Sequence, residues 1–87
     1  MTTTAPTEQD VLTGLADVLQ EVVGTAPEAV VPEATFDFHL DVDSLAMVEV
    51  VVACEDRFGV RIPDEDLERL RTVGDAVRYI VDAGAAA

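Results

Sequence analysis

Four stretches of the chain place apolar residues at the spacing of an amphipathic α-helix. They cover approximately residues 7–24, 44–58, 63–70 and 72–82. In each stretch apolar side chains recur every three or four positions, so they gather on one side of a helix. Outside them only the short segment 60–62 resembles a strand, and there is no internal repeat. The pattern therefore predicts an all-α fold, a small four-helix bundle with a short third helix.

The ends of these predicted helices carry residue types that start and stop helices. Thr7 with Asp10, and Thr72 with Asp75, resemble capping boxes in which aspartate replaces the usual glutamate. Gly59 follows the second helix, in the position where glycine commonly ends a helix. These signals support the helix boundaries that the apolar spacing predicts.

A long segment without helical periodicity separates the first two predicted helices. It runs from Gly24 to Asp43 and contains two prolines. A connection of roughly 20 residues is unusual in so small a domain. We expect an ordered loop that docks four apolar side chains inward, those of Val30, Val31, Phe36 and Leu40. The domain is expected to span residues 7–82, with flexible ends at 1–6 and 83–87.

The second predicted helix carries two apolar stripes. At about 100° per residue, the narrower stripe is interpreted as the core face, formed by Met47, Val51, Cys54 and Phe58. The other stripe consists of Leu45, Val48 and Val52 and is flanked by the acidic residues Glu49, Glu55 and Asp56. Because exposed apolar patches commonly mark interaction sites, this second stripe is predicted to be a docking surface.

The charge of the chain restricts its partners. Eighteen acidic residues oppose five basic ones, all arginines, which gives a net charge of −13. A polyanion would be repelled, so nucleic acid is excluded as a partner and proteins with basic patches are expected instead.

Composition also limits the chemistry. Eighty-seven residues support a modest core but no enzyme-sized enclosed active site. Cys54 cannot form an internal disulfide and is expected to be a buried structural thiol. His39 is expected to hydrogen-bond a neighbouring carboxylate, and a single histidine offers no metal site. With no signal peptide and no apolar run of about 20 residues, a cytoplasmic protein without a membrane span is expected.

The candidate for chemistry is a serine at the start of the second predicted helix. The N-terminus of a helix presents unpaired N–H groups and the positive end of its dipole, which favour a phosphate esterified to the Ser44 oxygen. Asp43 offsets part of this benefit, because its carboxylate competes for the same N–H groups. The alternative is that Ser44 is only an N-cap or first-turn residue. Serine hydrolysis is not expected, since no Gly-x-Ser-x-Gly elbow surrounds Ser44 and His39 is the only histidine.

Taken together, these features resemble an acyl carrier protein. The resemblance rests on Asp43-Ser44-Leu45, on the helix that follows and on the segment 58–64, and it covers nearly the whole chain. Residues 40–45 and 47–51 are especially similar to the discrete carriers of bacterial type II fatty-acid synthases, including those of actinobacteria.

The resemblance implies a function in delivery, without catalysis by the chain itself. A phosphopantetheinyl transferase would attach 4′-phosphopantetheine from coenzyme A to Ser44, between Asp43 and Leu45, and its thiol would carry acyl groups as thioesters. A monomer would then dock with a ketosynthase, acyltransferase, reductase or dehydratase and could enclose acyl chains within its bundle. The docking face implied by the family comprises Asp43, Leu45, Val48, Glu49, Val52, Glu55, Asp56 and Ile62.

Two departures from the family pattern and two alternative functions stay open. The chain has His39, after Phe38, and Ala46 where the family commonly has acidic residues, which weakens the acidic rim near Ser44. One alternative is a discrete carrier of a type II polyketide synthase, which would share Ser44 and the bundle. The other is a helical interaction module that carries no acyl group and uses Ser44 only as a cap.

Overall fold

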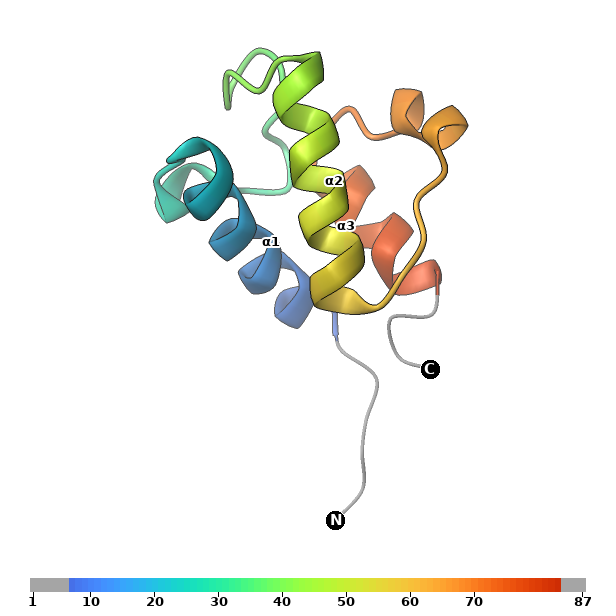
Figure 1. Cartoon of the computed structure of the whole chain (residues 1–87). Coiled ribbons are helices and arrows are strands. Elements are labelled where there is room, and N and C mark those ends of the chain that lie inside the picture. The colour runs from blue at the N-terminus through green and yellow to red at the C-terminus, as the bar shows by residue number, and fades with distance from the viewer. Residues whose placement is uncertain (1–6, 84–87) are drawn as a thin grey trace.

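The chain folds into helices joined by ordered loops, as a computed structural model shows (Figure 1). The structure describes residues 7–83, so the flexible ends predicted at 1–6 and 83–87 lie outside it, apart from Ala83. Its elements are α1 (Glu8–Val23), the 3₁₀ turn η1 (Pro27–Ala29), α2 (Ser44–Phe58), the 3₁₀ helix η2 (Asp64–Arg69) and α3 (Val73–Asp82).

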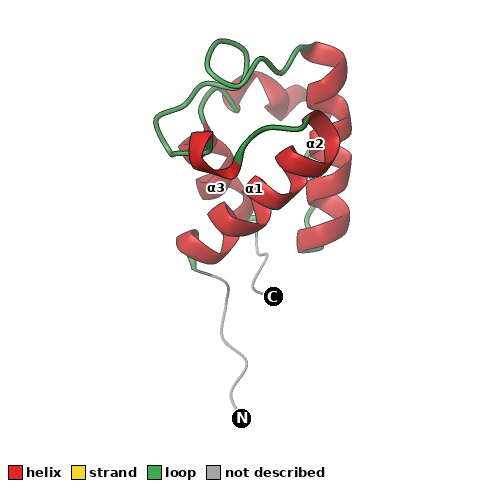
Figure 2. Cartoon of the chain, turned by 90° about the vertical axis from the view of Figure 1, so that its left-hand side faces the viewer, coloured by secondary structure: helices red, strands yellow, loops and turns green. Residues whose placement is uncertain are grey.

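The predicted all-α bundle is confirmed, with α1 as its central element. α1 packs against both α2 and α3, and the long loop closes one end of the bundle (Figures 1 and 2). The short third helix, expected at 63–70, is η2, a 3₁₀ helix that begins after Pro63. No helix in the described part is long and apolar enough to cross a membrane.

The local signals at the helix ends act as predicted. Thr7 and Asp10 form a reciprocal capping box at the start of α1, and Thr72 and Asp75 form another at the start of α3. Gly59 ends α2 with φ 66°, a left-handed conformation that glycine adopts without steric cost.

The core combines one face of each α-helix with side chains from the loops. Its loop members are Val30, Ala34, Phe36, Leu40, Val42, Val60, Ile62 and Leu70. The prediction for Val31 is wrong, since its side chain is 43% exposed, while its neighbour Val30 points inward. In α2 the buried side chains are those of Val50, Val51 and Cys54, whereas the predicted core residues Met47 and Phe58 are only partly buried. The buried face of α2 is thus centred on Val50, Val51 and Cys54, and α1 is the helix that packs against α2.

Cys54 is the buried structural thiol that the sequence predicts. Its side chain is 3% exposed, and burial raises the pKa of the thiol to about 12, with smaller opposing effects from Arg57 and Glu55. The thiol is therefore protonated at neutral pH and unreactive, since the thiolate is the nucleophile.

Backbone hydrogen bonds fix the long loop against the segment that leads into α3. The N–H groups of Phe36, Val73 and Gly74 donate to the carbonyl oxygens of Arg71, Ala34 and Pro32 at 3.1, 2.9 and 2.9 Å. Thr35 and Thr72 form an isolated antiparallel bridge within this contact. The loop is therefore ordered, as predicted, and it brings the chain to the start of α2 at a defined place.

α1 and α2 approach each other closely at Gly14. A Cβ atom at this position would lie 2.7 Å from Cζ of Phe58 and 3.0 Å from Nε of Arg57. Arg57 also forms an ion pair across the same interface, from its guanidinium to Asp17 at 3.1 Å. The missing side chain of Gly14 therefore allows the Phe58 ring to pack directly on α1.

We predict that Gly14→Ala destabilises the protein. In an open helix the change would stabilise by about 1 kcal/mol, but here the new methyl group forces the Phe58 ring away, at a typical overpacking cost of about 1–3 kcal/mol. Urea denaturation measures the difference. In a Phe58→Leu background, which removes the clashing ring atoms, the same change should cost less. Stabilisation by Gly14→Ala in the otherwise unchanged chain would contradict the prediction.

Candidate functional site

Ser44 is the first residue of α2, and its side chain is exposed. The N-cap is Asp43, whose Oδ1 accepts a hydrogen bond from the N–H of Ala46 at 2.8 Å. Of the two structural roles considered for Ser44, the structure thus shows a first-turn position and not the cap. Within the described residues the Ser44 hydroxyl has no hydrogen-bond partner in the protein, and Ser44 is also the only serine in the sequence.

The start of α2 leaves two backbone donors free beside this hydroxyl. Asp43 uses its side chain for the N–H of Ala46 and its carbonyl oxygen for the N–H of Met47, at 2.8 Å. The N–H groups of Ser44 and Leu45 belong to the first turn, where no intrahelical acceptor exists, and no other acceptor in residues 7–83 contacts them. These donors and the helix dipole favour an anion at the Ser44 oxygen, while the Asp43 carboxylate opposes one.

The loop before Ser44 closes on itself around a histidine. Nδ1 of His39 accepts a hydrogen bond from the N–H of Thr35 at 2.8 Å and lies 3.0 Å from the Thr35 hydroxyl. The predicted carboxylate partner of His39 is therefore wrong: the fold of the loop places the backbone N–H of Thr35, four residues earlier, against the ring instead. The rings of Phe38 and His39 meet edge to face, with 5.1 Å between their centroids. Phe38 itself is 82% exposed.

A cavity of about 480 Å³ opens beside Ser44. One side is formed by the long loop and the first turn of α2, through Thr35, Phe36, Asp37, Val42, Asp43, Ser44 and Met47. The other side comes from η2 and the residues after it, Leu67, Glu68, Leu70 and Arg71. Phe36, Val42 and Leu70 belong to the core, so the lining of this open cavity combines the exposed Ser44 with side chains of the core.

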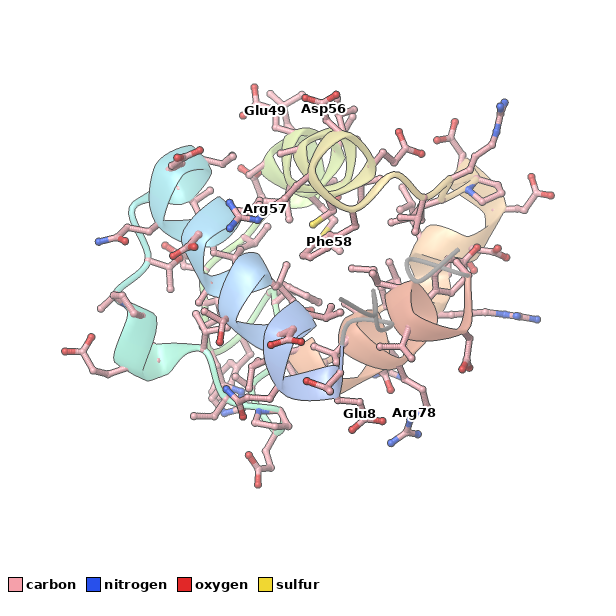
Figure 3. The ribbon with its side chains drawn as sticks, turned by 90° about the horizontal axis from the view of Figure 1, so that it is seen from below. Glu8, Glu49, Asp56, Arg57, Phe58 and Arg78 are labelled. Atoms are coloured by element: carbon pink, nitrogen blue, oxygen red, sulfur yellow. The ribbon has the colours of Figure 1, made fainter. Side chains whose placement is uncertain are left out.

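The outer face of α2 carries the predicted docking stripe. Leu45, Val48 and Val52 are 75%, 48% and 57% exposed. Glu49 and Asp56 are also exposed and point away from α1 and α3 (Figure 3). An apolar stripe with acidic neighbours is thus present on one surface.

Two other residues assigned to that face have structural roles. Ile62 is 4% exposed, so it contributes almost nothing to the surface. Glu55 is partly buried, and its Oε2 accepts a hydrogen bond from the N–H of Ile62 at 2.8 Å. In the extended segment 60–62 alternate side chains point inward, which buries Ile62 and exposes Arg61. The expectation of a docking side chain at Ile62 is therefore corrected.

The site contains residues that the sequence reasoning did not identify. Asp37, Glu68 and Arg71 line the cavity beside Ser44. Glu68 and Arg71 lie more than 20 positions after Ser44 in the chain, and the backbone pairing of residues 32–36 with residues 71–74 brings their segment near. No local pattern indicates that pairing. Among the described residues there is also no cluster of three or more side chains suited to a metal ion.

Comparison with known proteins decides the family. The family described as "Phosphopantetheine attachment site" matches residues 13–80. An acyl carrier protein of Acidothermus cellulolyticus is 56% identical over 79 residues, which are 91% of this chain and 94% of that protein. The chain belongs to the acyl carrier proteins.

Other relatives of this carrier protein agree with the assignment. A meromycolate extension acyl carrier protein of Mycolicibacterium smegmatis is 54% identical over 76 residues, covering 87% of this chain and 77% of that protein. The solved acyl carrier protein of Enterococcus faecalis superposes with a TM-score of 0.74 at 35% identity, over 90% of this chain and 99% of that one. The fold and the family inferred from the sequence are thus confirmed.

The family assignment defines the kind of function. An acyl carrier protein is not an enzyme; it carries acyl groups on a covalently attached phosphopantetheine and interacts with the enzymes of fatty-acid synthesis. The residues of this carrier protein fit such a group: an exposed, unbonded hydroxyl, two free N–H groups and an adjacent cavity with partly apolar walls.

We predict that Ser44→Ala and Asp43→Ala differ in their effect on stability. Asp43 is the N-cap, so its loss should lower the free energy of unfolding by about 0.5–2 kcal/mol. Ser44→Ala removes an exposed hydroxyl that bonds nothing in the fold and should change stability by less than about 0.5 kcal/mol. Thermal or urea denaturation of the unmodified protein measures both. A larger loss for Ser44→Ala than for Asp43→Ala would reverse this assignment of the cap.

Proposed function

We propose that the Ser44 oxygen is the attachment point of 4′-phosphopantetheine, and that this protein carries fatty acyl intermediates. The observation that carries the proposal is the exposed Ser44 hydroxyl, which is unbonded and lies at the mouth of a partly apolar cavity. When bound, the group supplies a thiol that holds acyl chains as thioesters. A phosphopantetheinyl transferase using coenzyme A would attach it.

The residues around Ser44 have distinct tasks in this proposal. The N–H groups of Ser44 and Leu45 lie where they can face the negative charge of a phosphate on the serine oxygen. Asp43 caps the first turn of α2 through its bond to Ala46, and Ser44 is exposed in that turn. The apolar side chains of the cavity offer a surface that shields part of an acyl chain from water.

The relatives favour fatty-acid synthesis over polyketide synthesis. Several mycobacterial and mycolicibacterial proteins that are 51–54% identical are named for meromycolate extension. We infer that the chain serves a discrete fatty-acid synthase and that elongation of long chains is one such use. A helical module without an acyl group is not favoured, because the attachment-site family matches most of the chain.

The outer face of α2 is proposed as the docking surface for the partner enzymes. Leu45, Val48 and Val52 would contact an apolar patch, while Glu49 and Asp56 would face basic side chains of a ketosynthase, acyltransferase, reductase or dehydratase. Opposite charges steer such encounters, and the net charge of −13 supports this. We also propose that the protein acts in the cytoplasm, where coenzyme A is available. It would act as a monomer, which leaves the apolar stripe of α2 free for the partner enzymes.

Loading of the protein tests the attachment site. The unmodified protein is incubated with coenzyme A and a broad-specificity phosphopantetheinyl transferase, and its intact mass is recorded. We expect one added phosphopantetheine, located on Ser44 by fragmentation, and none on Ser44→Ala. Thr25→Val is the control, since it removes a hydroxyl that bonds no described residue and lies outside this cavity, and this variant should still be loaded. An unmodified wild-type protein, or a loaded Ser44→Ala variant, would refute the proposal.

Charge reversal tests the docking surface. We predict that Glu49→Lys or Asp56→Lys slows association with a ketosynthase that has a basic patch, and that the effect is larger at low salt than at high salt. Stopped-flow binding at several ionic strengths measures the rates. Glu28→Lys in η1 is the control, because it changes the net charge equally at an exposed position outside α2. An equal effect of all three changes would attribute the steering to net charge and not to this face.

A further inference from the structure

The cavity beside Ser44 has a single basic residue in its lining, Arg71. Three acidic residues, Asp37, Asp43 and Glu68, line the same cavity. A phosphate on Ser44 would therefore meet mostly negative side chains, of which Asp43 is its immediate neighbour. Arg71 is the one lining residue whose charge attracts it.

The backbone of Arg71 is held in place from two sides. Its carbonyl oxygen accepts the N–H of Phe36 at 3.1 Å, and its own N–H donates to Oδ2 of Asp75 at 3.3 Å. The first bond ties Arg71 to the loop that leads into Ser44, and the second ties it to the first turn of α3. The backbone from which the Arg71 side chain extends is thus fixed relative to Ser44, although 27 positions separate the two residues in the sequence.

The guanidinium group of Arg71 is available for a ligand. Its side chain is exposed, and the ion pair found in residues 7–83 joins Arg57 to Asp17 instead. None of its side-chain donors makes a hydrogen bond to another described residue. The neighbouring acids of the cavity therefore leave this cation without a direct partner in the fold.

We propose that Arg71 binds the phosphate of the prosthetic group, and so holds the first part of the arm at the mouth of the cavity. This inference rests on the proposed attachment to Ser44. A guanidinium presents a planar fork of donors that matches two phosphate oxygens, and such charge-assisted bonds are stronger than neutral ones. Arg71 offsets the repulsion from Asp43, Asp37 and Glu68, and directs the arm along the cavity. A basic group of a partner enzyme would compete for the same phosphate and release the arm.

Nuclear magnetic resonance of the arginine side chains tests the contact without any substitution. The chain has five arginines, so its Nε–Hε spectrum is small enough to assign completely. Conversion of the unmodified protein to the phosphopantetheinylated form should shift the Arg71 resonance and leave that of Arg69 unchanged. The shift should shrink as the ionic strength rises from about 0.01 M to about 1 M, over which the Debye length falls from about 30 to about 3 Å.

Matched variants provide the second readout, the phosphorus resonance of the arm. Arg71→Gln should shift the ³¹P signal of the loaded protein toward that of free phosphopantetheine, and Arg71→Lys should retain part of the effect. Arg69→Gln is the control, since Arg69 is an exposed arginine two positions away that does not line the cavity.

The results separate this inference from the attachment on which it rests. Only protein whose mass shows the added group is used, so a failure of loading refutes the attachment site before Arg71 is tested. In loaded protein, an Arg71 resonance that does not respond to loading overturns the inference. So does a phosphorus signal that Arg71→Gln and Arg69→Gln leave equally unchanged. Those outcomes would mean that Arg71 is only a solvated surface charge.

Discussion

The site depends on the backbone pairing between the long loop and the segment that enters α3. The loop connecting α1 to α2 is costly to order, because each fixed residue loses about 1–2 kcal/mol of conformational free energy. Hydrogen bonds from Phe36, Val73 and Gly74 and the burial of Phe36 and Leu40 offset that cost. This pairing holds the loop that leads into α2 against the segment that follows η2, and both parts of the chain line the cavity beside Ser44.

Features encoded locally could be predicted from the sequence, and those created by tertiary pairing could not. The helices, their capping boxes, Gly59 and the exposed stripe of α2 follow from the order of nearby residues, and the structure bears them out. Ser44 could be found because it marks a helix start in a recognisable motif. The burial of Ile62, the outward side chain of Val31 and the approach of Arg71 depend on which distant segments meet, and no spacing along the chain indicates them.

Asp43 has two opposing effects at the start of α2, because it stabilises the helix and repels an anion. A phosphate near a helix N-terminus benefits from free N–H groups, yet Asp43 occupies one of them, that of Ala46, and adds a negative charge. Because Asp43 caps the helix, the turn that presents Ser44 keeps its shape before any group is attached. The structure thus favours a preformed, accessible hydroxyl over the strongest possible binding of an anion, and a cation from across the cavity is the natural compensation.

In the proposed function, the short helix α2 serves both the prosthetic group and the partner enzymes. Glu49 and Asp56 point outward from the bundle (Figure 3), whereas Glu55, of the same charge, is partly buried and accepts a hydrogen bond from the N–H of Ile62. Glu55 therefore anchors the segment before η2, which forms the far wall of the cavity, while its neighbours stay free for docking. An enzyme that covers the outer stripe would leave the cavity wall intact. In the proposed function, the attachment site and the docking surface meet in the first turn of α2, where Ser44 and Leu45 are adjacent.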